Sequence, residues 1–188
     1  MLIPAIGYFP GAESVVWRDF FTHEPLSNPT QTQTLAVPLG KIGLHIRSGS
    51  ALVLYEEPGY TIASTRRSDI SLLVSLSPGT DGDARGKVYF DDGESLPPTP
   101  YREVEIFAES GRDGGKIWFA GEGTYVPQSK LRTVVVLVNE GGGSGITEVR
   151  VGDEIWKLWH WDEKLGKLVI ESVGIDLNGL TVDTISWR

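Results

Sequence analysis

The sequence predicts an all-β fold of antiparallel β-sandwich domains with little helix. Short runs rich in Val, Ile, Leu, Tyr and Trp lie between turn-forming residues, and the 23 glycines and 11 prolines are spread along the chain. Short apolar runs separated by turn-forming residues are typical of antiparallel sandwiches. No window repeats apolar residues at i, i+3, i+4 and i+7 between helix caps, so few helices are expected.

The expected strands are runs that end mostly at Gly, Pro, Asn or Asp. Thr133–Val138 is apolar at nearly every position, which predicts a strand covered on both faces. Asn28–Thr34, rich in Thr and Gln, is expected to be a loop. The strand runs are Leu44–Arg47, Ile70–Leu76, Lys87–Phe90, Val104–Ala108, Thr133–Val138, Thr147–Val151, Ile155–Trp161, Lys167–Ser172 and Thr181–Trp187.

Two segments compete as an internal domain boundary. The 188 residues allow one large domain or two small ones. Pro58–Ser68 is polar, whereas Leu96–Pro100 carries three prolines in five residues. Proline cannot donate to a sheet ladder and stiffens an extended connection, which favours the second segment. We therefore expect one sandwich domain over residues 1–97 and another over residues 98–188.

The charge pattern argues against nucleic acid and membranes as partners. The chain carries 25 acidic and 17 basic residues, a net charge of -8, and its basic residues are scattered. A nucleic-acid binder needs clustered Lys and Arg. No run of about 18 apolar residues could span a membrane, and no signal peptide is visible at the amino terminus. The compartment stays open, because a chain without cysteine does not depend on the redox environment.

No metal or cofactor site is expected. The absence of cysteine rules out thiolate ligands, and His23, His45 and His160 lack the spacing of a zinc motif. Asp91-Asp92-Gly93-Glu94 offers oxygen ligands for calcium, but it reads better as a polar turn after a strand.

Asp19 lies in the aromatic segment Trp17-Arg18-Asp19-Phe20 and invites the role of a glycosidase nucleophile. The simpler interpretation, an Asp in a surface turn, is favoured. No catalytic residue is therefore assigned.

Trp159 and Trp161 are the candidate carbohydrate-binding residues. On a strand they share one face, while Trp156 and His160 take the other. Two neighbouring indoles on an exposed face would form a stacking platform for sugar rings. The alternative, which weighs more, is that one face belongs to the core and the other is covered by a neighbouring segment.

Three segments, read in order, resemble glycoside hydrolase family 31, the α-glucosidase family. Tyr8-Phe9-Pro10-Gly11 followed by Trp17–Thr22 resembles the family's "YFP-x-G…WYD-x-x-TG". Val37–Ser50 resembles "APLD-x-I-x-x-HVRGGS", and Lys87–Ser95 resembles "LYxDDGES". The chain departs from these patterns at Arg18, Gly40 and Ser48, which replace a Tyr, an Asp and a Gly.

The resemblance implies the proximal and distal carboxy-terminal β-sandwich domains of an α-glucosidase. In the family "DDGES" lies near the end of the proximal domain, which supports the boundary at residue 97. The family's catalytic aspartates lie on a (β/α)₈ barrel of about 250 residues, and no such barrel is present here. Trp17-Arg18-Asp19 also lacks the Asn-Glu that continues the family's nucleophile motif, so no catalytic role carries over.

Three functions follow as hypotheses. The first is a non-catalytic region that braces, or remains from, a glycosidase barrel, and it predicts an apolar patch on the first domain. The second is a free-standing carbohydrate-binding module for an α-glucan or oligosaccharide. The third and weaker one is a protein-interaction domain. Family members are often secreted, but the sequence does not decide the location.

Overall fold

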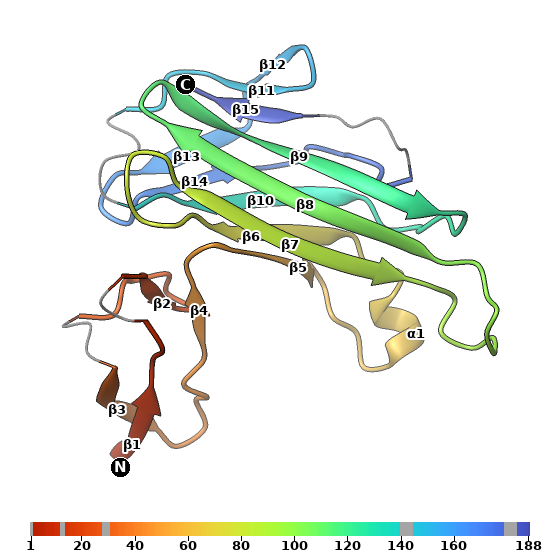
Figure 1. Cartoon of the computed structure of the whole chain (residues 1–188). Helices are drawn as coiled ribbons and strands as arrows, with labels where there is room; N and C mark the ends of the chain where they lie inside the picture. Colours follow the sequence, from red (N-terminus) through yellow and green to blue (C-terminus); the bar gives the residue numbers. More distant parts are fainter. Residues whose placement is uncertain (1, 12–13, 28–30, 140–144, 179–183) are drawn as a thin grey trace. The chain divides into compact units, whose positions relative to one another are not determined.

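A computed structural model describes residues 2–11, 14–27, 31–139, 145–178 and 184–188. Within these residues it contains fifteen strands and one short helix, so the expected all-β class with little helix is confirmed. The chain separates into two compact units, residues 1–48 and 49–188. Each unit is described by itself below (Figure 1).

The first unit consists of two small antiparallel ribbons. β1 (Leu2–Tyr8) pairs with β3 (Thr32–Pro38), and β2 (Trp17–Asp19) pairs with β4 (His45–Arg47). The expected loop at Asn28–Thr34 was therefore wrong at its end, because Thr32 already pairs with Tyr8. Residues 28–30 lie outside the described part of the chain. β-branched threonines suit a pleated ribbon, and this preference prevailed over the polar composition.

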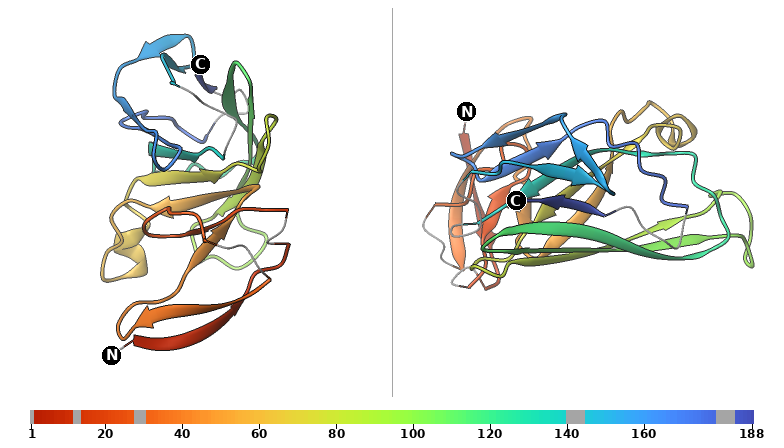
Figure 2. Two further views of the ribbon diagram at one scale, coloured as in Figure 1. Left: turned by 90° about the vertical axis from the view of Figure 1, so that its left-hand side faces the viewer. Right: turned by 90° about the horizontal axis from the view of Figure 1, so that it is seen from above.

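The second unit is built on one eleven-stranded sheet with the order β12-β11-β15-β9-β8-β7-β5-β6-β10-β14-β13. In Figures 1 and 2, β7, β8 and β9 form one layer, and β6, β10 and β14 form the layer behind it. The strands and the helix are β5 (Ser50–Tyr55), α1 (Ile62–Thr65), β6 (Ile70–Ser75), β7 (Asp83–Phe90), β8 (Arg102–Gly111), β9 (Gly114–Gly123), β10 (Leu131–Leu137), β11 (Val149–Val151), β12 (Glu154–Trp156), β13 (Trp159–Asp162), β14 (Lys167–Ile170) and β15 (Ile185–Trp187).

The core of this unit lies between the two layers. Leu72, Val74, Val134 and Val136 from the back layer face Ile106 and Ile117 from the front layer, and all are almost fully buried. The opposite face of β6 is covered too, because Leu73 and Ser75 are also buried. Residues 133–138 were expected to form a strand covered on both faces. In β10 the consecutive residues Val136 and Leu137, which point to opposite faces, are indeed both fully buried.

The seam between the layers joins β5 to β7. The two strands share a single parallel register pair, Ser50 with Arg85. A Cβ placed on Gly86 would lie only 2.1 Å from the carbonyl oxygen of Ala51, so glycine lets the two backbones approach closely.

The antiparallel pattern that the sequence predicts has two exceptions. β5 with β7 is one, and β6 with β10 is the other, where six residue pairs run parallel. β6 and β10 are joined through the whole β7–β8–β9 meander, and a long connection of this kind is what parallel neighbours require.

The expected boundary at residues 97 and 98 falls inside the second unit. β7 and β8 stand on either side of it and pair antiparallel over eight residues, from Asp83 with Glu109 to Phe90 with Arg102. The proline-rich segment is therefore a connection between two neighbouring strands, and the compact units divide at residue 48. A division into family domains at residue 97 stays a prediction.

The expected strand Ile155–Trp161 is two strands in the structure. β12 ends at Trp156 and β13 begins at Trp159. β12 pairs with β11 in one layer, and β13 pairs with β14 in the other, so the tryptophans are divided between them. Of the expected strand Thr181–Trp187, the structure describes residues 184–188 and shows pairing from Ile185 onward.

Candidate docking surface

The first unit has a very small core of its own. Among its described residues the buried apolar side chains are Phe9 and Ile46. Phe9 packs edge-to-face against Trp17 and His45, with ring centroids 5.5 and 5.1 Å apart. Two-stranded ribbons with so little buried surface are marginal in water, so this unit needs further contacts to be stable.

An apolar groove of about 450 Å³ lies along the β1–β3 ribbon and the segment that follows it. Ile6, Leu39 and Ile42 line it and are 79%, 84% and 68% exposed. The remaining lining residues are small or apolar apart from one lysine: Ala5, Gly7, Leu35, Val37, Pro38, Gly40, Lys41 and Gly43.

The turn after β3 shapes this groove. The Lys41 amide donates to the Pro38 carbonyl at 3.1 Å, and Gly40 adopts a φ of 91°, which other residues rarely adopt. A Cβ on Gly43 would already touch Val37 at 3.4 Å, so glycine lets the chain lie close to β3. The sequence analysis expected an apolar patch on a first domain of residues 1–97. It named no residues for this patch, because β1 and β3 were not recognised as strands.

Asp19 is a turn residue, as the sequence favoured. Its Oδ1 accepts hydrogen bonds from the backbone N–H groups of Phe21 and Thr22, both at 2.8 Å. Burial raises the pKa of Asp19, but these backbone hydrogen bonds and nearby Lys41 together lower it below its ordinary value. Its carboxylate is thus occupied in holding the turn after β2.

Asp92 likewise organises the turn after β7. It accepts hydrogen bonds from the Ser95 hydroxyl and from the backbone N–H groups of Ser95 and Glu94, and these lower its pKa to about 2. Gly93 adopts a φ of 71°, and the Arg66 guanidinium lies where its Cβ would be. The polar-turn interpretation of residues 91–94 fits this geometry.

No group of three or more His, Cys, Asp or Glu side chains in the described residues is arranged to hold a metal ion. His45 packs against Phe9, and His160 is exposed on β13. Within the same residues, no helix is long and apolar enough to cross a membrane.

The candidate sugar-binding tryptophans lie on the core side of β13. Trp159 pairs with Ile170 and Trp161 with Leu168, both fully buried, and the two indoles are half-buried against the core. Trp156 belongs to β12, where its indole N–H donates to the Glu171 carbonyl at 2.8 Å. Sugar binding by Trp159 and Trp161 stays a prediction.

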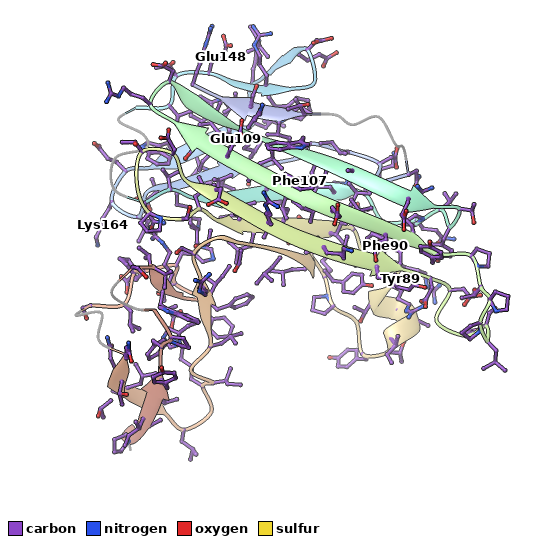
Figure 3. All side chains as sticks on the ribbon, in the orientation of Figure 1. Tyr89, Phe90, Phe107, Glu109, Glu148 and Lys164 are labelled. Atoms are coloured by element: carbon purple, nitrogen blue, oxygen red, sulfur yellow. The ribbon has the colours of Figure 1, made fainter. Side chains whose placement is uncertain are left out.

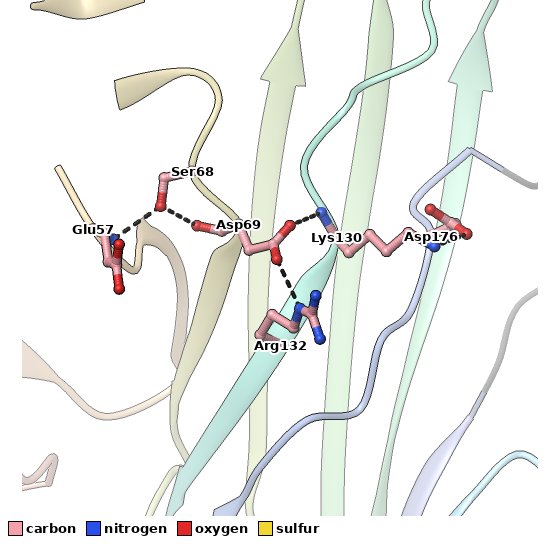
Figure 4. A network of polar contacts seen from close by, with 6 residues as sticks. All are labelled: Glu57, Ser68, Asp69, Lys130, Arg132 and Asp176. Carbon is pink, nitrogen blue, oxygen red and sulfur yellow. Dashed lines mark hydrogen bonds and ion pairs between the residues drawn. The ribbon is translucent and has the colours of Figure 1, made fainter. Parts of the chain in front are cut away.

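A polar network ties the start of β6 to the start of β10. Asp69 accepts hydrogen bonds from the Lys130 backbone N–H at 2.8 Å and from Arg132 at 2.7 Å, which lowers its pKa (Figure 4). Lys130 in turn pairs with Asp176 at 3.1 Å. Asp69 and Arg132 also line an open polar cleft of about 560 Å³, and their ion pair supports the parallel strand pair.

The chain is similar in sequence to fungal glucosidases. It is 36% identical to glucoamylase 1 of Candida albicans over 132 residues, which are 70% of this chain and 13% of that protein. It is 31% identical to the α-glucosidase of Candida tsukubaensis over 172 residues, 91% of this chain and 15% of that protein. A family 31 glucosidase of Schizosaccharomyces pombe is 28% identical over 132 residues, 70% of this chain and 13% of that protein. No protein-family model matches the chain.

The fold is that of a part of larger glucosidase structures. The chain superposes on the glucosidase II catalytic subunit, in its complex with a regulatory subunit, with a TM-score of 0.71 at 21% identity. The match covers 97% of this chain and 21% of that one. The segments matched in the two Candida proteins are 13% and 15% of those proteins, so the chain spans about one seventh of their length.

Proposed function

We propose that this chain, a homologue of the family 31 glucosidases, is a non-catalytic carboxy-terminal β-sandwich region that braces a catalytic barrel. The single observation that carries the proposal is the exposed apolar groove of the first unit, with Ile6, Leu39 and Ile42 on its surface. Contiguous apolar surface of this kind marks an interaction site.

The size of the first unit's core supports the same conclusion. A unit with Phe9 and Ile46 as its described apolar core gains stability when a partner covers its exposed ribbon. Lys41 contributes the one charge on the groove's lining, so the partner surface is expected to be mainly apolar. The relatives are several times longer than the matched segment, which leaves room in them for a barrel of about 250 residues.

The test is a chimera of the Candida tsukubaensis α-glucosidase in which this chain replaces the matching segment. We expect a soluble chimera that hydrolyses maltose, while the isolated chain does not. In the double variant Ile6→Ser/Ile42→Ser, the groove loses its apolar contacts, and we expect a lower melting temperature and less active protein. The measurements are yield, melting temperature and maltose hydrolysis.

The matched control is Ile155→Ser, which removes a 56% exposed isoleucine from the second unit. It is expected to behave like the unmodified chimera. Hydrolysis of maltose by the isolated chain would contradict the proposal, and so would equal behaviour of the groove variant and the control.

A further inference from the structure

Four tyrosines converge at one end of the second unit from distant parts of the sequence. Tyr55 ends β5, Tyr89 lies near the end of β7, Tyr101 precedes β8 and Tyr125 follows β9. Tyr55, Tyr89 and Tyr125 line a small pocket of about 70 Å³ together with Phe90 and Pro127. Figure 3 shows Tyr89 and Phe90 at the end of β7. We call this site the tyrosine cleft.

The aromatic surface of the tyrosine cleft is open to solvent. Tyr55, Tyr89 and Tyr101 are 40%, 53% and 37% exposed. The rings of Tyr89 and Tyr101 are stacked, with centroids 5.6 Å apart and planes 9° apart. Single exposed aromatics are ordinary, but the stacked pair of Tyr89 and Tyr101 presents a larger continuous ring surface, which can serve as a binding site.

Both hydrogen-bond donors and hydrogen-bond acceptors lie beside these rings. Arg66 and Asp91 form an ion pair at 3.7 Å, and both line the pocket with Gln128. The Tyr101 hydroxyl donates to the Glu122 carboxylate at 3.4 Å, and the charge of Glu122 raises the pKa of Tyr101. The cleft therefore offers donors and acceptors beside apolar ring faces.

The cleft is held in place before any ligand arrives. Ser129 donates to the Arg66 carbonyl at 3.2 Å, while the Tyr125 amide donates to the Tyr101 carbonyl at 2.9 Å. Arg102, which is buried, donates to the Tyr125 carbonyl at 3.2 Å. A site with an ordered frame loses less conformational entropy on binding.

We infer that the tyrosine cleft binds a neutral oligosaccharide. A sugar ring presents an apolar C–H face to an aromatic ring and hydroxyl groups to charged and amide side chains. The carboxylate of Glu122 beside Tyr101 disfavours an anionic ligand by charge repulsion, while the charge of Asp91 is balanced by Arg66. The pocket has room for one edge of a sugar, so the ring lies on the exposed tyrosines and the glycan chain continues into solvent. This function is separate from the bracing of a barrel and does not depend on it.

The test is calorimetric titration of the full chain with maltotetraose, cellotetraose and mannotetraose. We expect at least one of them to bind. Tyr89→Ala and Tyr101→Ala each remove a stacking surface and are expected to weaken this binding about tenfold, whereas Tyr89→Trp keeps the surface and retains it. Tyr60→Ala is the matched control, because Tyr60 is fully exposed and does not line the cleft. It is expected to bind like the unmodified chain.

Urea unfolding of each variant verifies that it folds. Absence of binding to all three oligosaccharides by the folded chain overturns the inference. Binding that is unchanged in both Tyr89→Ala and Tyr101→Ala also overturns it. If Trp159→Phe and Trp161→Phe then abolish this binding, the site lies on β13 instead.

Discussion

Asp92 shows how a single carboxylate organises a turn. It accepts three hydrogen bonds from Glu94 and Ser95, and its pKa falls from 3.8 to about 2. Its folded-state pKa lies below the unfolded value, so its contribution to stability is present above about pH 4 and is lost as the pH falls through about 2. The sequence suggested a polar turn here, because an acidic pair before a glycine is a common turn signal.

We expect Asp92→Ala to lower the urea midpoint at neutral pH, because the backbone N–H groups of Glu94 and Ser95 lose their acceptor. The difference between variant and parent should stay constant down to about pH 4 and shrink toward about pH 2, where the parent carboxyl takes up a proton. Urea unfolding at several pH values measures this. A difference that is unchanged at the lowest pH would contradict the electrostatic explanation.

At the scale of elements, the seam between β5 and β7 decides how the sandwich closes. The single register pair of Ser50 with Arg85 brings the two backbones together beside Gly86. The sequence did not predict this seam. β5 was not recognised as a strand, and the expected strand Lys87–Phe90 began after Gly86, so this glycine was not placed in a strand.

Gly86→Ala is expected to destabilise the chain by about 1–3 kcal/mol, because its Cβ would meet the Ala51 backbone and force the strands apart. Gly111→Ala is the matched control, since its Cβ would have an ordinary contact of 3.8 Å with Asp81. Urea unfolding compares the two variants. Equal free energies of unfolding would show that the seam adapts without cost.

At the scale of the whole molecule, the apolar core belongs to the second unit. The principal cluster of buried apolar residues runs from Ala51 to Trp187, and its members all lie beyond residue 48. A domain folds alone when it has a core of its own. The two units are thus expected to differ in their dependence on a partner.

A fragment of residues 49–188 is therefore expected to fold without the first unit. It should give the circular dichroism spectrum of a β protein and one cooperative urea transition. The dependence of its unfolding free energy on urea concentration should be slightly weaker than that of the full chain, because less surface is exposed on unfolding. A fragment of residues 1–97, which cuts β7 from β8, is the control and is expected to remain unfolded. A cooperative transition in the control and none in the first fragment would restore the boundary at residue 97.

The sequence by itself determined the all-β class, the relation to the glucosidases and the turn roles of Asp19 and Asp92. These properties depend on local signals, namely short apolar runs, turn residues and linear motifs. The tertiary structure decided the parallel pair β6–β10, the division at residue 48, the core-side position of Trp159 and Trp161, and the gathering of Tyr55, Tyr89, Tyr101 and Tyr125. Each of these depends on contacts between residues far apart in the chain, which local periodicity does not encode.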